Sequence, residues 1–241
     1  MRSNASSTSK VFLAVIVLSG LAVLTNGVLH PSSANLVRFL SFLAVACVAA
    51  QLKVKLPGLT GNMSVNLPFI LVAAAELSSS EALAVACFST LVQCLPRGAQ
   101  KFNMAQVIFN FSNMALAVGA TRMVLGSSAL NASADSHVRL LCFSAAAFFI
   151  VNTASVAIII SLTESKNALK VWGNIFQLSF PYFVLSAGVA TLVLIAAKQI
   201  GWQLPLFVLP IMFGVFSSYK RYFGSESAPA PLPTSKAVAV S

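Results

Sequence analysis

The sequence predicts an all-α membrane protein, a bundle of about eight membrane-embedded helices. Two observations lead to this fold class. Of the 241 residues, 58% are hydrophobic and 8% are charged, and the mean hydropathy is +0.88, whereas a soluble domain carries roughly 25% charged residues. The apolar residues also form continuous runs instead of alternating with polar ones, which favours helices over a membrane β-barrel. An ordinary soluble enzyme is therefore excluded.

Eight apolar segments account for nearly the whole chain. They cover residues 11–29, 36–52, 64–78, 81–96, 104–125, 138–162, 176–198 and 203–218. The polar residues before the first segment resemble the start of a signal peptide, but no clear cleavage site follows, so we expect that segment to be retained. Because a crossing takes roughly 20 residues, we expect the short third and fourth segments to be tilted or re-entrant. The number of full crossings then lies between six and eight.

The net charge of +10 comes from 15 basic and 5 acidic residues, and the basic ones are scattered between the apolar segments. If eight segments alternate from a cytoplasmic N-terminus, eleven basic residues lie on the cytoplasmic side. The opposite side has four, which are Arg38, Arg122, Arg139 and Lys198. Cytoplasmic loops are enriched in Lys and Arg, so this excess predicts that both termini are cytoplasmic. It also explains the charge without nucleic acid, and we expect no nucleic-acid partner.

Three parts of the chain follow from this pattern. Residues 1–10 form a cytoplasmic N-terminal segment, and residues 11–223 form the transmembrane helical domain. Residues 224–241 are rich in Pro, Ala and Ser and show no amphipathic period. Such a composition predicts a disordered cytoplasmic tail.

The sequence contains no recognisable catalytic motif. It has no nucleophile elbow, zinc-protease motif, P-loop or dinucleotide-binding glycine pattern. The four cysteines, Cys47, Cys87, Cys94 and Cys142, lie within apolar runs and lack metal-ligand spacing, as is typical of free thiols that pack as small hydrophobes. We therefore expect a protein that is not an enzyme, with no catalytic residues, no metal site and no cofactor.

Polar side chains at membrane depth are the informative residues, because a polar group that faces lipid is costly. The candidate ligand-binding residues are Asn62, Ser64, Asn66, Gln106, Asn110, Asn113, Asn152 and Tyr182. They either hold helices together by hydrogen bonds or line a small-molecule pocket. We expect Asn66, Asn110, Asn113 and Asn152 to point toward one shared region. We also expect an irregular or broken helix around Asn62–Pro68, because Pro68 lacks a backbone donor.

Short phrases along the chain resemble a known family. They are residues 52–66 (LKVKLPGLTGNMSVN), 109–113 (FNFSN), 151–153 (VNT), 180–182 (FPY) and 218–222 (SYKRY). Across residues 10–223 the chain resembles the bacterial polytopic membrane module found N-terminal to diguanylate cyclase, HD-type phosphodiesterase or kinase output domains. The resemblance implies a multi-span sensory input module whose ligand is generally undefined. We expect no such output domain here, because the Pro- and Ala-rich tail stands in its place.

Three classes of function remain open. The first is a non-enzymatic, multi-pass protein of the bacterial inner membrane that binds a small or lipophilic ligand, a membrane-protein partner or a second copy of itself. The second is the substrate-binding subunit of a small-molecule uptake system, which needs a separate energising partner because the chain has no ATP site. The third is a structural or accessory subunit of a larger membrane complex.

Overall fold

The computed structural model describes residues 7–29, 35–55, 62–95, 103–127 and 136–226. Its elements are α1 (Ser7–Leu29), α2 (Leu36–Ala50), β1 (Lys53–Lys55), β2 (Asn62–Ser64), α3 (Leu67–Glu76), α4 (Ser79–Cys94), α5 (Met104–Leu125), α6 (Ser136–Glu164), α7 (Ala168–Ile200), the 3-10 helix η2 (Leu204–Phe207) and α8 (Val208–Glu226). The predicted helical bundle is confirmed, with one helix for each predicted segment. Nearly all of the predicted tail lies outside the described residues.

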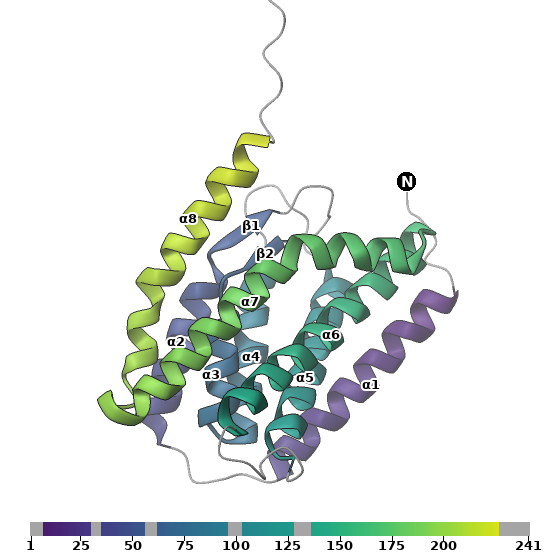
Figure 1. Cartoon of the computed structure of the whole chain (residues 1–241). Helices are drawn as coiled ribbons and strands as arrows, with labels where there is room; N and C mark the ends of the chain where they lie inside the picture. Colours follow the sequence, from purple (N-terminus) through teal and green to yellow (C-terminus); the bar gives the residue numbers. More distant parts are fainter. Residues whose placement is uncertain (1–6, 30–34, 56–61, 96–102, 128–135, 227–241) are drawn as a thin grey trace, which may run out of the picture.

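Successive helices run in alternating directions through the bundle (Figure 1). The start of α1 and the end of α8 lie toward the same end, which also carries the β1–β2 hairpin (Figure 1). The bundle is held together by contacts of α5 with α1, α4 and α6, of α6 with α7, and of α2 with α4. An even number of alternating helices therefore brings both ends of the described chain to one side.

The helices differ widely in length. Within the described residues, α1, α5, α6 and α7 are long and apolar enough to cross a membrane. By contrast, α2 has 15 residues and α3 has 10, so α3 is about 15 Å long. The four long apolar helices are those of a multi-pass membrane protein, and the short third helix was expected from the sequence.

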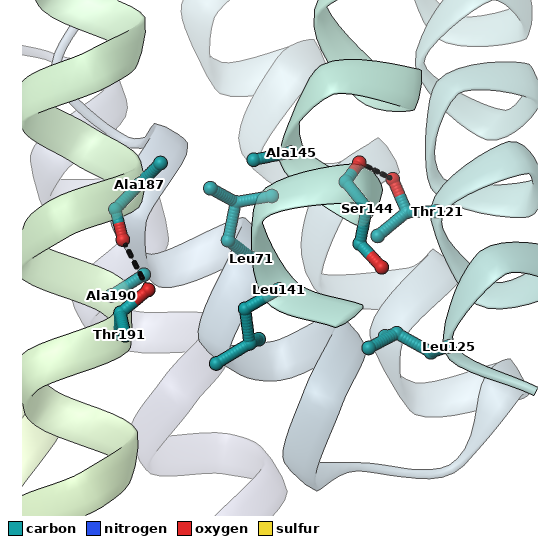
Figure 2. Close-up of a pocket in the computed structure, with 9 residues that line it drawn as sticks. All are labelled: Leu71, Thr121, Leu125, Leu141, Ser144, Ala145, Ala187, Ala190 and Thr191. Atoms are coloured by element: carbon teal, nitrogen blue, oxygen red, sulfur yellow. Dashed lines mark hydrogen bonds between the residues drawn. The ribbon is translucent and has the colours of Figure 1, made fainter. Parts of the chain in front are cut away.

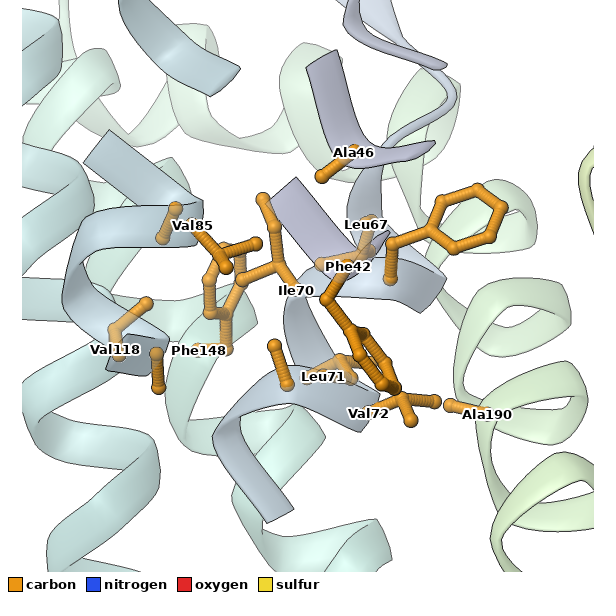
Figure 3. Packing of buried hydrophobic residues seen from close by; sticks show 14 of the residues in the cluster. Phe42, Ala46, Leu67, Ile70, Leu71, Val72, Val85, Val118, Phe148 and Ala190 are labelled. Carbon is orange, nitrogen blue, oxygen red and sulfur yellow. The ribbon is translucent and has the colours of Figure 1, made fainter. Parts of the chain in front are cut away.

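The core of the bundle is built around α3. Every residue from Leu67 to Ala74 is buried. Side chains of α2 (Phe42), α4 (Val85), α6 (Phe148) and α7 (Ala190) surround the helix (Figure 3). A helix that is apolar on all sides belongs in the interior, so α3 is enclosed by its neighbours instead of facing lipid.

The chain before α3 is irregular, as predicted, and forms a short antiparallel hairpin. Lys53 pairs with Ser64 and Lys55 with Asn62, and α3 begins only at Leu67. Pro68 lies in the first turn of α3, where its missing N–H is not needed. The Lys53 ammonium donates to the carbonyl of Leu95 at the end of α4 (2.9 Å), and α8 packs against β1. The hairpin therefore contacts both the end of α4 and the last helix, α8.

The other end of α3 is bound by two arginines. Arg122 of α5 donates from Nη1 to the carbonyls of Ala74 (2.7 Å) and Leu77 (3.0 Å). Its Nη2 donates to the hydroxyl of Ser79 (3.0 Å). Arg38 of α2 forms an ion pair with Glu76. The last carbonyls of a helix lack partners within it, so these side chains satisfy the end of α3 and the turn into α4.

The longest helix, α7, has 33 residues and contains Pro181. A proline inside a helix removes a backbone hydrogen bond and bends it, and α7 changes direction along its length (Figure 1). The helix starts at Ala168, eight residues before the predicted segment. Its added first turns pack Val171 and Ile175 against Ala157 of α6.

Candidate functional site

Three of the candidate residues meet where the hairpin joins α3. The Ser64 hydroxyl donates to Asn66 Oδ1 (2.7 Å), and Asn66 Nδ2 donates to the hydroxyl of Ser89 on α4 (3.2 Å). The Tyr182 hydroxyl on α7 donates to the Ser64 carbonyl (3.0 Å) and accepts from the backbone N–H of Leu67 (3.4 Å). All five residues are buried. This polar group therefore joins the hairpin, α3, α4 and α7.

Tyr182 also contacts the last helix. Its ring lies 6.3 Å from the ring of Tyr219 on α8, at an angle of 76°. The neighbouring Pro181 marks the point where α7 lacks a backbone hydrogen bond. A single buried side chain beside a proline thus connects α7 with the hairpin and α8.

Replacing Tyr182 with Phe should lower the free energy of unfolding by about 1–3 kcal/mol, because the Ser64 carbonyl and the Leu67 N–H lose their buried partner. The ring and its packing are kept, so the hydroxyl alone is tested. Tyr222→Phe on α8, where the side chain is 66% exposed, is the matched control. Equal unfolding midpoints for the two variants in detergent would contradict this role of Tyr182.

A second polar contact joins α5 to α6. Asn113 Nδ2 donates to Asn152 Oδ1 (2.9 Å) and to the Asn152 carbonyl (3.3 Å). Asn113 is 2% exposed, and its Oδ1 has no hydrogen-bond partner within the described structure. Hydrogen bonds of this kind, between side-chain amides on neighbouring helices, hold membrane helices together.

Asn113→Leu should destabilise the protein by about 1 kcal/mol, since an interhelical hydrogen bond in membranes contributes roughly 0.6 kcal/mol on average and at most about 1.7. Gln106→Leu is the control, because Gln106 lies on the same helix with an exposed side chain. The measurement is the midpoint of unfolding in detergent. Similar midpoints for Asn113→Leu and Gln106→Leu would show that the Asn113–Asn152 contact does not hold the helices together.

The remaining candidates lie elsewhere. Asn110 Nδ2 donates to the Cys94 sulfur (3.5 Å). Gln106 is exposed in the first turn of α5, which differs from the inward position expected for it. Asn62 lies in β2 opposite Lys55. The four asparagines predicted to converge do lie inside, Asn66 and Asn113 buried and Asn110 and Asn152 half-buried, but their hydrogen bonds form three groups with different partners.

A small crevice lies between α3, α5, α6 and α7 (Figure 2). It is lined by Leu71, Thr121, Leu125, Leu141, Ser144, Ala145, Ala187, Ala190 and Thr191. The space left among them is about that of one water molecule. The Ser144 hydroxyl in its lining has no hydrogen-bond partner within the described structure. Sequence reasoning missed these residues, because isolated Ser and Thr in an apolar helix usually bond to their own backbone.

Within the described residues, no three His, Cys, Asp or Glu side chains lie close enough together to share a metal ion. All four cysteines are free thiols, and only Cys87 is fully buried. The candidate residues themselves carry neutral amides and hydroxyls, which bind by hydrogen bonding. The chain matches no known protein family, no curated protein and no solved structure.

Proposed function

We propose that the protein is a non-enzymatic sensory input module of a bacterial inner membrane, with eight crossings and both ends in the cytoplasm. It binds a small or lipophilic ligand, or a membrane-protein partner, and passes the resulting change to its C-terminal helix. The sequence phrases that resemble such modules include the hairpin, Asn113, Asn152 and Tyr182. In the fold, these residues lie at the contacts between helices.

The observation that carries this proposal is the contact of Tyr182 with three elements besides its own helix. The side chain belongs to α7, bonds to the hairpin and to α3, and packs against Tyr219 of α8. A displacement of α7 at Pro181 therefore changes the hairpin and α8 together. A packed contact of this type favours discrete alternative arrangements of the helices. A sensory module needs such arrangements in order to report, at a distance, that its ligand site is occupied.

The distribution of charge supports the proposed orientation. At the end of the bundle that holds the hairpin, Lys53 lies in β1, Lys170 near the start of α7, and Lys220 and Arg221 near the end of α8. At the opposite end, Arg38 and Arg122 are bonded to the end of α3, and Arg139 and Lys198 lie near the ends of α6 and α7. With Lys10, Lys55 and Lys166 included, the hairpin end has seven of the described basic residues and the opposite end four, which favours the hairpin end as the cytoplasmic side.

A second candidate is the substrate-binding subunit of an uptake system. The short buried α3 after a non-helical hairpin favours it, because binding sites of transporters are often built at interrupted helices. The two candidates differ in their partners, since an uptake subunit must be energised by an ATPase.

Native mass spectrometry of the protein released gently from membranes distinguishes these functions. The sensory proposal predicts a retained small molecule or a bound membrane protein without ATPase subunits. Stable co-purification with an ATPase would instead favour the uptake subunit. Recovery of the bare chain, with neither ligand nor partner, would contradict both proposals.

A further inference from the structure

The hydroxyl of Ser144 stands out among the buried hydroxyls of the crevice. Thr121 and Thr191 each donate to the carbonyl four residues earlier in their own helix, at 2.8 Å in both cases. Ser144 is 2% exposed, yet its Oγ has no partner within the described structure. A buried hydroxyl without a partner is costly. The crevice therefore holds one polar group that a ligand can satisfy.

The other side chains that line the crevice are apolar or, in the two threonines, have their hydroxyls bonded within their own helix. Leu71, Ala145 and Ala190 are buried at its floor, while Leu125 and Leu141 are half-buried at its rim. Ala187 and Thr191 of α7 are half-buried as well, and α6 and α7 are both long and apolar enough to cross a membrane. The side chains on α7 stand opposite those on α5 and α6 (Figure 2).

No charged side chain lines this space, so an ionised ligand would be left without a partner in an apolar site. The free space is about that of one water molecule, so it fits the hydroxyl group of a ligand, and an alkyl chain must lie outside it. We infer that the crevice binds an uncharged single-chain amphiphile, with its hydroxyl bonded to Ser144 and its chain along α6 and α7. This inference rests on the proposed function and names the ligand class for it.

The test uses the full-length protein in phosphatidylcholine nanodiscs and a hexadecanol that carries a photoreactive diazirine. Labelled peptides are mapped by mass spectrometry, with unlabelled hexadecanol, 1-palmitoylglycerol, hexadecane and hexadecanoate as competitors. We expect saturable labelling of peptides that contain Leu141 or Ala187. The two hydroxyl-bearing competitors should remove it, while the alkane and the ionised acid should not. Competition by 1-palmitoylglycerol at lower concentration than hexadecanol would identify a membrane lipid as the better source of this chemistry.

Two variants distinguish the contribution of the Ser144 hydroxyl to labelling from that of the free space in the crevice. Ser144→Ala should weaken labelling roughly fivefold, the effect of one lost hydrogen bond. Ala187→Leu should abolish labelling by filling the crevice, and Thr191→Leu offers a second filling variant if the first does not fold. Ala146→Leu is the matched control, because Ala146 is exposed on α6 and does not line the crevice.

Labelling spread evenly over the lipid-facing helices, or unchanged in the filling variants, would overturn the inference. Equal competition by hexadecanoate would overturn the uncharged ligand class. A partner protein found by native mass spectrometry alongside such a result would leave the proposed function standing. The failure of the inference and the failure of the proposed function are therefore distinguishable.

Discussion

Arg122→Met is expected to lower the free energy of unfolding by about 3 kcal/mol or more. The guanidinium donates to two backbone carbonyls at the end of α3 and to the Ser79 hydroxyl. A hydrogen bond that involves a charged group contributes about 1.5–3 kcal/mol. Methionine keeps much of the apolar stem but leaves the carbonyls of Ala74 and Leu77 without these donors, at the end of the innermost helix.

Unfolding of the purified protein by SDS in mixed micelles measures this loss. Lys198→Met is the matched control, since Lys198 is an exposed cation near the end of α7. Arg122→Lys should recover part of the stability, because an ammonium reaches fewer of the three acceptors. If Arg122→Met and Lys198→Met unfold at the same SDS fraction, the end of α3 does not depend on Arg122.

Gly20→Ala is expected to destabilise the protein by about 2 kcal/mol, because it overpacks the contact of α1 with α5. A Cβ at Gly20 would lie 2.7 Å from the carbonyl oxygen of Ser112 and 2.9 Å from its Cα. Both are backbone atoms, so no side-chain rotation relieves the contact and the two helices must separate. Small residues allow such close approach of membrane helices.

Gly188→Ala is a control for which we expect the opposite effect on stability. A Cβ at Gly188 meets nothing within 4 Å, and alanine favours a helix by up to about 1 kcal/mol over glycine. The same SDS titration should therefore show Gly20→Ala below the wild type and Gly188→Ala at or above it. Equal stability of the two variants would place α1 away from Ser112.

The sequence was sufficient to predict the helices, because a long continuous apolar run is rarely found in any structure other than a membrane helix. The eight segments, the short third helix and the irregular chain before Pro68 were all expected. The hairpin itself was not predicted, since strands of three residues are too short to show a period. The early start of α7 was missed because its first turns include Lys170 and Asn174 and so fall outside the apolar run.

The polar interior was predicted only in part. Burial of Asn66 and Asn113 follows from the cost of exposing amides to lipid. The sequence does not predict that the four asparagines form three separate hydrogen-bonded groups, because the grouping depends on which helices are neighbours. Likewise, a count of charges places Arg122 on one side of the membrane but cannot show that its guanidinium binds the end of α3. The sequence could not predict that the Ser144 hydroxyl lacks a partner, since most serines in helices bond to their own backbone.

The central proposal is that the short helices α2, α3, α4 and α8 are part of a bundle that crosses the membrane eight times. Reporter fusions after Gly126 and after Gly224 test it most directly, with alkaline phosphatase active outside and a fluorescent protein emitting inside. Eight crossings place Gly126, at the end of α5, outside and Gly224 inside. If only α1, α5, α6 and α7 cross, both positions are cytoplasmic. An outward Gly126 with an inward Gly224 is the predicted result, and the same side for both would contradict the eight-crossing bundle.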